Sequence, residues 1–230
     1  MSTPFTPPAP VYLPVAHTPT LFPVHRVYCI GGNYLAHAKE MGSKTNHQQP
    51  FFFMKPADAL QPSGEVPYPS ATHNLHHEVE MVVALKQGGH DIPCEQALDC
   101  IYAYAVGLDL TRRDLQAAAK QGGLPWDAAK GFDHSAPLSK LHRMEDIGHP
   151  DARTLSLTVN GEPRQQGRTD TMIHNVASII HELSLLWLLQ PGDVIFTGTP
   201  AGVGALQVGD QFHAELEDIA VLEGRILPSI

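Results

Sequence analysis

The sequence predicts an α+β fold with a β-rich core, and three observations carry this prediction. Short apolar or β-branched runs recur along the chain between turns that contain glycine or proline. The segment LSLTVNGEPRQQG alternates in polarity and contains Asn160-Gly161, a dipeptide typical of tight hairpin turns. Helical spacing of apolar residues is clearest in residues 171–189. Because strands and hairpins outnumber helices, the pattern favours a mixed architecture over a parallel βαβ sheet.

The first third of the chain is predicted to contain an arm, a strand and a short helix. Residues 1–24 hold seven prolines, which indicates an extended arm lying over a single domain of residues 25–230. A buried strand is expected at residues 27–30, followed by a helical piece within NYLAHAKEMG. Residues 43–50 are polar and are predicted as a mobile loop before the apolar run at residues 51–54.

Further strands are expected at residues 78–85, 104–110 and 194–197, with a short helix at residues 93–101. Thr111 and Asp114 resemble a capping box, which would open a helix that runs through Lys120. The helix at residues 171–189 should end before Pro191-Gly192.

Composition excludes several classes of protein. With 43% hydrophobic and 17% charged residues, the 230-residue chain is typical of a globular protein. Its net charge of -9 argues against nucleic-acid binding, and no apolar run is long enough to span a membrane. The N-terminus has no secretory signal pattern, and Cys29, Cys94 and Cys100 are predicted to be reduced thiols in a cytoplasmic protein.

Two glutamates at the start of the second predicted strand indicate a metal site. Residues i and i+2 of a strand share a face, so Glu78 and Glu80 should project together. Carboxylates this close repel each other unless a cation such as Mg²⁺ or Mn²⁺ neutralises them. Asp109 adds a third carboxylate where the run YAYAVGL ends. The alternatives are solvated glutamates on an edge strand and an aspartate that caps a helix.

Three other features could carry chemistry, and each has a structural alternative. Lys130, in PWDAAKGFD, could stabilise an oxyanion or enolate, or be a solvated lysine. His37 and Glu40 could act as a base and its orienting carboxylate, or form an ordinary surface pair. The loop TGTPAGVG, with Thr199, could cradle a carboxylate, or form a tight turn between strands.

Zinc is disfavoured, because no HExxH or CxxC pattern is present. Histidines do precede the two glutamates, at His73, His76 and His77. We expect the paired histidines His76 and His77 to lie beside the site rather than to bind the metal.

Seven segments together resemble the fumarylacetoacetate hydrolase family. They occur in the family's order over about residues 25–226, and they are GGNYLAHAKEMG, FFFMKP, LHHEVEMVVAL, YAVGLDLTRRDLQ, GLPWDAAKGFD, LTVNGEPRQQG and PGDVIFTGTPAGVG. Each segment is modest alone, whereas the ordered set is specific. The combination of HAKEMG, PFFFMKPADAL, VGLDLTRRDLQ and PWDAAKGFD is most similar to the fumarylpyruvate hydrolases of gentisate breakdown.

The resemblance implies a mixed β-roll or β-sandwich core with flanking helices and a short N-terminal lid helix, in a homodimer. It implies that Mg²⁺ or Mn²⁺ is bound by Glu78, Glu80 and Asp109. It implies that catalysis is carried by His37, Glu40 and Lys130. It implies that substrate is contacted by Arg113, Gln116 and Thr199, with Lys55 as a weaker candidate. One departure is Gly32, where many relatives have arginine in GRNY, so a cation near the lid is missing.

The expected activity is metal-dependent hydrolysis of a C–C bond in an acylpyruvate, a 1,3-dioxo acid. The expected substrate is fumarylpyruvate, which gives fumarate and pyruvate in aromatic catabolism. Oxaloacetate decarboxylation or 2-oxo-enoate isomerisation on the same scaffold stays open, since both pass through enolates. A non-catalytic protein that binds metal and carboxylate is a further alternative.

Overall fold

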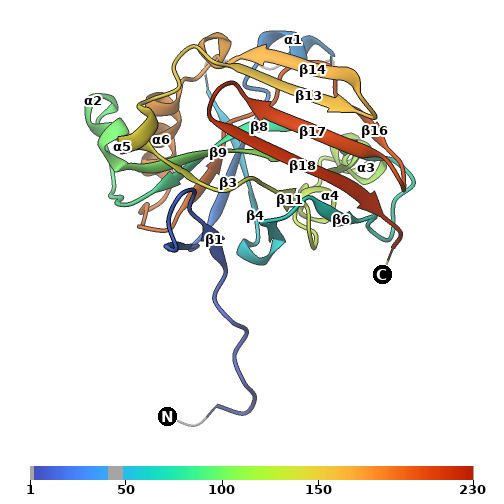
Figure 1. The fold of residues 1–230 in the computed structure, drawn as a ribbon, viewed down its shortest axis with the longest axis horizontal. Helices are drawn as coiled ribbons and strands as arrows, with labels where there is room; N and C mark the ends of the chain where they lie inside the picture. The colour runs from blue at the N-terminus through green and yellow to red at the C-terminus, as the bar shows by residue number, and fades with distance from the viewer. Residues whose placement is uncertain (1–2, 41–48, 230) are drawn as a thin grey trace.

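A six-stranded mixed sheet forms the centre of the molecule (Figure 1). In spatial order its strands are β12 (His142–Arg143), β9 (Ile101–Leu108), β8 (Val79–Leu85), β15 (Val194–Phe196), β3 (Val27–Gly31) and β4 (Phe51–Lys55). Only the β15–β3 pair is parallel among these described strands. All seven residues of β8 are buried, because the strand is central and both faces of the sheet are covered. This computed structural model describes residues 3–40 and 49–229, so most of the loop predicted at residues 43–50 lies outside the described residues.

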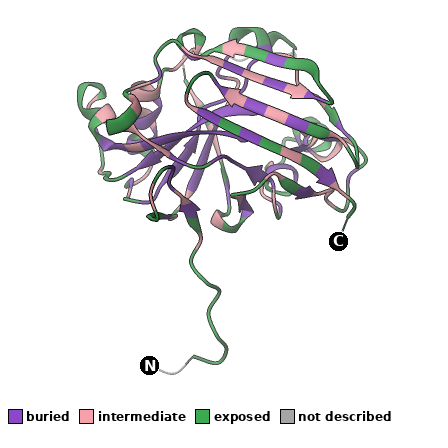
Figure 2. Cartoon of the chain, viewed as in Figure 1, coloured by how far each residue is buried: buried purple, intermediate pink, exposed green. Residues whose placement is uncertain are grey.

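A second sheet packs against the first and supplies the other half of the core. Its strands, in spatial order, are β14 (Glu162–Arg168), β13 (Thr154–Val159), β17 (Gln211–Leu216), β18 (Ala220–Leu227) and β6 (Glu65–Pro67). Figure 2 shows buried and exposed residues alternating along β17 and β18, as expected for a sheet with one face in the core. Asn160 and Gly161 have φ of 54° and 80° and join β13 to β14, so the predicted hairpin is confirmed.

Shorter strands complete the β structure. A three-stranded sheet contains β10 (Thr111–Arg112), β7 (Leu75–His77) and β16 (Gly204–Leu206), and β11 (Ala136–Pro137) pairs with β5 (Leu60–Gln61). Within the proline-rich arm, β1 (Tyr12–Pro14) and β2 (Leu21–Pro23) form an antiparallel hairpin. Leu13 and Phe22 of this hairpin are buried in the core, whereas the residues before β1 extend away from the body in Figure 1.

The helices are short and lie at the ends of the sheets. They are α1 (Leu35–Glu40), α2 (Cys94–Ala97), α3 (Arg113–Gly122), α4 (Asp127–Lys130), α5 (Met144–Ile147) and α6 (Val176–Leu186), with 3₁₀ turns η1 (Ala57–Ala59), η2 (Leu98–Cys100) and η3 (Thr169–Thr171). Helices α2, α5 and α6 gather at one end of the molecule, and α3 and α4 at the other (Figure 1). Within the described part of the chain, no helix is long and apolar enough to cross a membrane. The predicted α+β fold is confirmed.

Two local predictions were wrong, one because a local cap starts the helix later and one because a residue distant in sequence binds the predicted capping side chain. Helix α6 begins at Val176 rather than residue 171, because the Asn175 side chain accepts a hydrogen bond from Ser178 N (2.9 Å) and caps it. The capping box of Thr111 and Asp114 does not form. Instead, Asp114 Oδ1 accepts a hydrogen bond from the Thr72 hydroxyl (2.6 Å), and Thr111 pairs in strand β10.

Helix α6 offers a test of the packing. Leu183 is fully buried in the core, whereas Leu185 on the same helix is 47% exposed. Leu183→Ala should lower the free energy of unfolding by about 2–5 kcal/mol, because it leaves a cavity. Leu185→Ala should change it by less than about 0.5 kcal/mol. Urea unfolding followed by circular dichroism measures both, and equal losses would contradict this packing.

Candidate active site

Three carboxylates meet where the adjacent strands β8 and β9 of the central sheet begin and end. Glu78 directly precedes β8, Glu80 lies within it, and Asp109 directly follows β9. The antiparallel β8–β9 register places these positions together, and Asp109 N donates a hydrogen bond to Glu78 O (2.8 Å). All three residues are buried, and one carboxylate oxygen of each lies within 4.8 Å of the others. The structure therefore brings the three predicted carboxylates together, and they are buried at central strands rather than solvated on an edge strand.

Two cationic side chains compensate Glu78. Lys130 Nζ, at the end of α4, lies 2.8 Å from Glu78 Oε2 and 2.6 Å from Asp109 Oδ2. Arg113 Nη2 donates to Glu78 Oε1 at 2.5 Å. Burial opposes ionisation of Glu78, yet the charges of Lys130 and Arg113 outweigh it and lower the pKa of this carboxyl. Burial opposes the charge of Lys130, but the charges of Asp109 and Glu78 raise its pKa, so Lys130 is a buried, paired cation rather than a solvated lysine.

Glu80 is the least compensated of the three carboxylates. Its Oε2 accepts a hydrogen bond from Gly198 N (2.7 Å), but it forms no ion pair within residues 3–40 and 49–229. Burial, together with the charges of Asp109 and Glu78, raises the pKa of Glu80 well above its usual value. A divalent cation next to Glu80 would remove this repulsion, and an all-oxygen donor set is the kind that Mg²⁺ and Mn²⁺ prefer. The residues present therefore fit such an ion.

Lys55 lies behind Asp109 rather than in the cavity. Its Nζ is 2.8 Å from Asp109 Oδ1. It also donates to Ser135 Oγ (3.1 Å), to Leu110 O (3.3 Å) and, by a short contact, to Lys130 O. Because the side chain is buried by these partners and lies outside the cavity wall, its placement favours holding Asp109 over contact with a substrate.

His37 and Glu40 form the pair that their helical spacing predicts. His37 Nδ1 lies 3.2 Å from Glu40 Oε2, and His37 lines the same cavity as the carboxylates. Both oxygens of Glu40 also lie 3.2 Å from Gly202 N, which donates to them. Helix α1 is thereby tied to the loop after β15, which also carries Gly198.

A cavity of about 750 Å³ brings most of the predicted residues together. Of those residues it is lined by His37, Glu78, Glu80, Asp109, Arg113, Gln116, Lys130 and Thr199. Arg113 and Gln116 lie one turn apart on α3, and Arg113 Nη1 donates to Gln116 Oε1 (2.6 Å). Gly32 also lines the cavity, and no heavy atom lies within 4 Å of the place where its Cβ would be. The space that an arginine would occupy in relatives with GRNY is therefore open.

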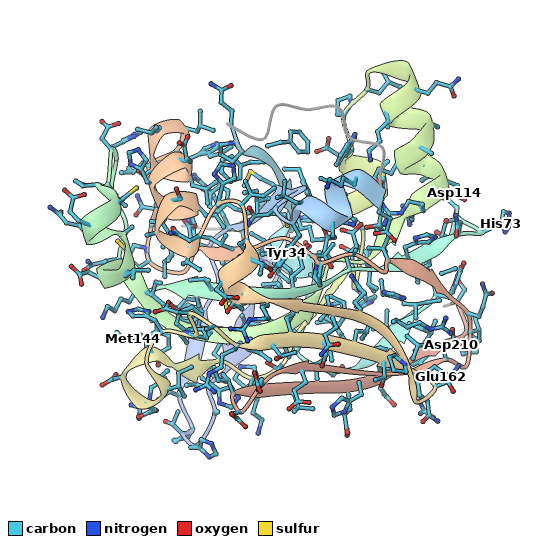
Figure 3. All side chains as sticks on the ribbon, turned by 90° about the horizontal axis from the view of Figure 1, so that it is seen from above. Tyr34, His73, Asp114, Met144, Glu162 and Asp210 are labelled. Atoms are coloured by element: carbon cyan, nitrogen blue, oxygen red, sulfur yellow. The ribbon has the colours of Figure 1, made fainter. Side chains whose placement is uncertain are left out.

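His76 and His77 lie beside the site, as predicted, whereas His73 does not. His76 Nδ1 accepts a hydrogen bond from Arg113 Nε (3.2 Å), and burial together with the Arg113 charge lowers the pKa of His76 to about 4. His77 Nδ1 bonds to Gln165 Oε1 (2.9 Å). His73 lies at the molecular edge with Asp114, and both are labelled in Figure 3.

Sequence reasoning missed the apolar wall of the cavity and one buried amide. Trp126 lies within the quoted motif PWDAAKGFD, and Trp187 has the helical spacing that had assigned it to the core. Phe51 stacks edge-on against Trp126, with ring centroids 4.9 Å apart. Gln165 is buried in the otherwise polar strand β14, next to the exposed Gln166. Two adjacent glutamines give no indication of which one faces inward.

Solved structures of similar chains match this fold over its whole length. Fumarylpyruvate hydrolase from Pseudomonas aeruginosa, in complex with Mn²⁺ and pyruvate, is 45% identical with a TM-score of 0.96, over 99% of this chain and 100% of that chain. A putative fumarylpyruvate hydrolase from Burkholderia cenocepacia is 44% identical with a TM-score of 0.93, over 100% of both chains.

Similar sequences include enzymes with another name. Oxaloacetate tautomerase FAHD1 of Rattus norvegicus is 42% identical over 87% of this chain and 90% of its own length. Oxaloacetate tautomerase YcgM of Escherichia coli is 45% identical over 83% of this chain and 87% of its own length. The family described as fumarylacetoacetate (FAA) hydrolase C-terminal matches residues 26–227. The chain therefore belongs to the fumarylacetoacetate hydrolase family.

Proposed function

We propose that this enzyme hydrolyses a C–C bond of an acylpyruvate, with fumarylpyruvate as substrate and fumarate and pyruvate as products. The observation that carries the proposal is that the three buried carboxylates and His37, which pairs with Glu40, meet at one cavity. The 45% identical fumarylpyruvate hydrolase, whose structure contains Mn²⁺ and pyruvate, supports the same substrate class.

Glu78, Glu80 and Asp109 would hold Mg²⁺ or Mn²⁺. Such an ion, when bound, supplies Lewis-acid stabilisation of negative charge on the 2-oxo group. Arg113, Gln116 and Thr199 also line the cavity and would bind the carboxylate end of the substrate. The apolar wall of Phe51, Trp126 and Trp187 would lie along the acyl chain.

His37 would act as the general base. Glu40 accepts from Nδ1 and thereby fixes the tautomer in which Nε2 can take a proton from water. The hydroxyl adds to the distal carbonyl carbon, and the bond from that carbon to the methylene breaks. The electron pair of this bond passes into the pyruvate enolate, and its methylene carbon then takes the proton that His37 accepted from water. Lys130 uses two of its three N–H groups on Glu78 and Asp109, and the third would turn to the enolate oxygen.

Oxaloacetate tautomerisation is the second candidate, because relatives at 42% and 45% identity carry that name. This reaction also develops negative charge on a 2-oxo group, but it moves a proton without breaking a C–C bond.

Four further expectations stay predictions. They are the homodimer, the cytoplasmic location, a lid movement of α1 and a domain boundary at residue 24.

A substrate panel separates the two candidates. Fumarylpyruvate, a saturated acylpyruvate and oxaloacetate should each be assayed by absorbance with Mg²⁺, with Mn²⁺ and with chelator. We expect metal-dependent release of pyruvate and fumarate from fumarylpyruvate. Tautomerisation of oxaloacetate without cleavage of any acylpyruvate would contradict hydrolysis. No turnover of any 2-oxo acid would support the non-catalytic alternative.

The base is tested by His37→Ala. This variant should lower kcat for hydrolysis by about 10²–10⁴-fold while Mn²⁺ affinity is kept, because the imidazole is not a metal ligand in the proposal. His73→Ala, an exposed histidine outside the cavity, is the matched control and should keep full activity. Unchanged turnover in His37→Ala would remove His37 from the mechanism.

The metal site is tested by Asp109→Asn, which keeps the size of the side chain but removes its charge. Calorimetric titration should show loss of Mn²⁺ binding, and activity should fall to the level seen in chelator. Asp99→Asn, at an exposed carboxylate away from the cavity, should bind Mn²⁺ as the unmodified enzyme does. Full activity of the unmodified enzyme in chelator would refute the role of the metal.

A further inference from the structure

The backbone N–H and C=O of Val79, the residue between the two glutamates, lie beyond the end of the neighbouring strand β15. Strand β15 pairs with β8 only from Val82 to Ala84, so Val79 has no ladder partner on that side. Its N–H donates instead to Gln165 Oε1 (3.0 Å), and its C=O accepts from Thr199 Oγ1 (2.8 Å). The side chains of Gln165 and Thr199 therefore make the two hydrogen bonds that a neighbouring strand would make to Val79, the residue between Glu78 and Glu80.

Gln165 uses its whole amide in this arrangement. Besides Val79 N, its Oε1 accepts from His77 Nδ1 (2.9 Å). Its Nε2 donates to Thr199 Oγ1 (2.8 Å) and to Pro200 O (2.8 Å). Because Val79 N can only donate and Pro200 O can only accept, the orientation of the amide is fixed. A buried amide with all four bonds made is rigid, and losing them leaves unpaired polar groups.

Strand β14 also sets the position of the loop that contacts Glu80 and Glu40. A Cβ on Gly167 would lie 2.6 Å from Pro200 Cβ, and one on Gly202 would lie 2.1 Å from Arg164 O. The loop of residues 198–204 therefore rests directly on β14, next to Gln165. In Figure 3, the labelled Glu162 marks the start of this strand, which runs from the turn of its hairpin.

We propose that Gln165 is a positioning residue, which sets the spacing of Glu78 and Glu80 for a divalent cation. It does so by holding the Val79 peptide and by fixing Thr199 in the loop that carries Gly198. Gln165 does not line the cavity, so it acts through these groups and not on the substrate. The inference rests on the proposed metal role of Glu78 and Glu80.

Gln165→Met tests the proposal, since it keeps the volume of the side chain and removes all four hydrogen bonds. The dissociation constant for Mn²⁺, measured on the full chain by electron paramagnetic resonance of free Mn²⁺, should rise about 10–100-fold. Much of kcat should return at saturating Mn²⁺. Gln166→Met, on the exposed side of the same strand, is the matched control and should leave the constant unchanged. A folded Gln165→Met with unchanged Mn²⁺ affinity and a lower unfolding midpoint would show a structural role only and overturn the proposal.

Thr199→Val tests the positioning role of Gln165 if Gln165→Met does not fold. It removes the hydroxyl that joins Gln165 to Val79 O, whereas Thr199→Ser keeps that hydroxyl. Without substrate present, Thr199→Val should weaken Mn²⁺ binding and Thr199→Ser should restore it. Equal Mn²⁺ affinity in both variants would overturn the proposal. Absence of Mn²⁺ binding by the unmodified chain is a different result, which refutes the metal site itself.

Discussion

The burial of three carboxylates within 4.8 Å of one another is the constraint on which the rest of the site depends. Burial and mutual repulsion both favour protonation, so a cluster of this kind exists only where neighbouring groups offset its charge. Lys130 bridges Glu78 and Asp109, and Lys55 approaches Asp109 from behind. Within residues 3–40 and 49–229, Glu80 has no cationic partner and accepts one hydrogen bond, from Gly198 N, so a bound cation would contribute most there.

The loop after β15 extends this constraint to the His37–Glu40 pair. Its residue Gly198 donates to Glu80, and its residue Gly202 donates to Glu40. One short segment therefore contacts a carboxylate of the cluster and the carboxylate that orients the base. A shift of this loop against β14 would change both contacts at once. The loop packs so closely on that strand that Cβ atoms at Gly167 and Gly202 would clash.

Local periodicity was sufficient to predict the parts of the site that depend on one element. The i, i+2 spacing of Glu78 and Glu80 fixes their common face whatever surrounds the strand. It was insufficient where the partner is distant in sequence. Asp114 was predicted as a helix cap, yet a residue 42 positions away competes for it. Lys55 is a charged residue, yet it is buried against groups that are distant in sequence and that the fold brings to it. For Gln165 the sequence gives no indication of its burial.

The carboxylates and Lys130 alone do not distinguish hydrolysis from tautomerisation, because both reactions place negative charge on the same 2-oxo oxygen. What separates them is the far end of the substrate. Hydrolysis needs a second carbonyl within reach of His37 and room for the acyl group beyond it. A cavity of about 750 Å³ whose apolar wall includes Phe51, Trp126 and Trp187 is larger than a four-carbon acid needs. The volume of this cavity and its apolar wall therefore support the proposal of a longer acylpyruvate as substrate.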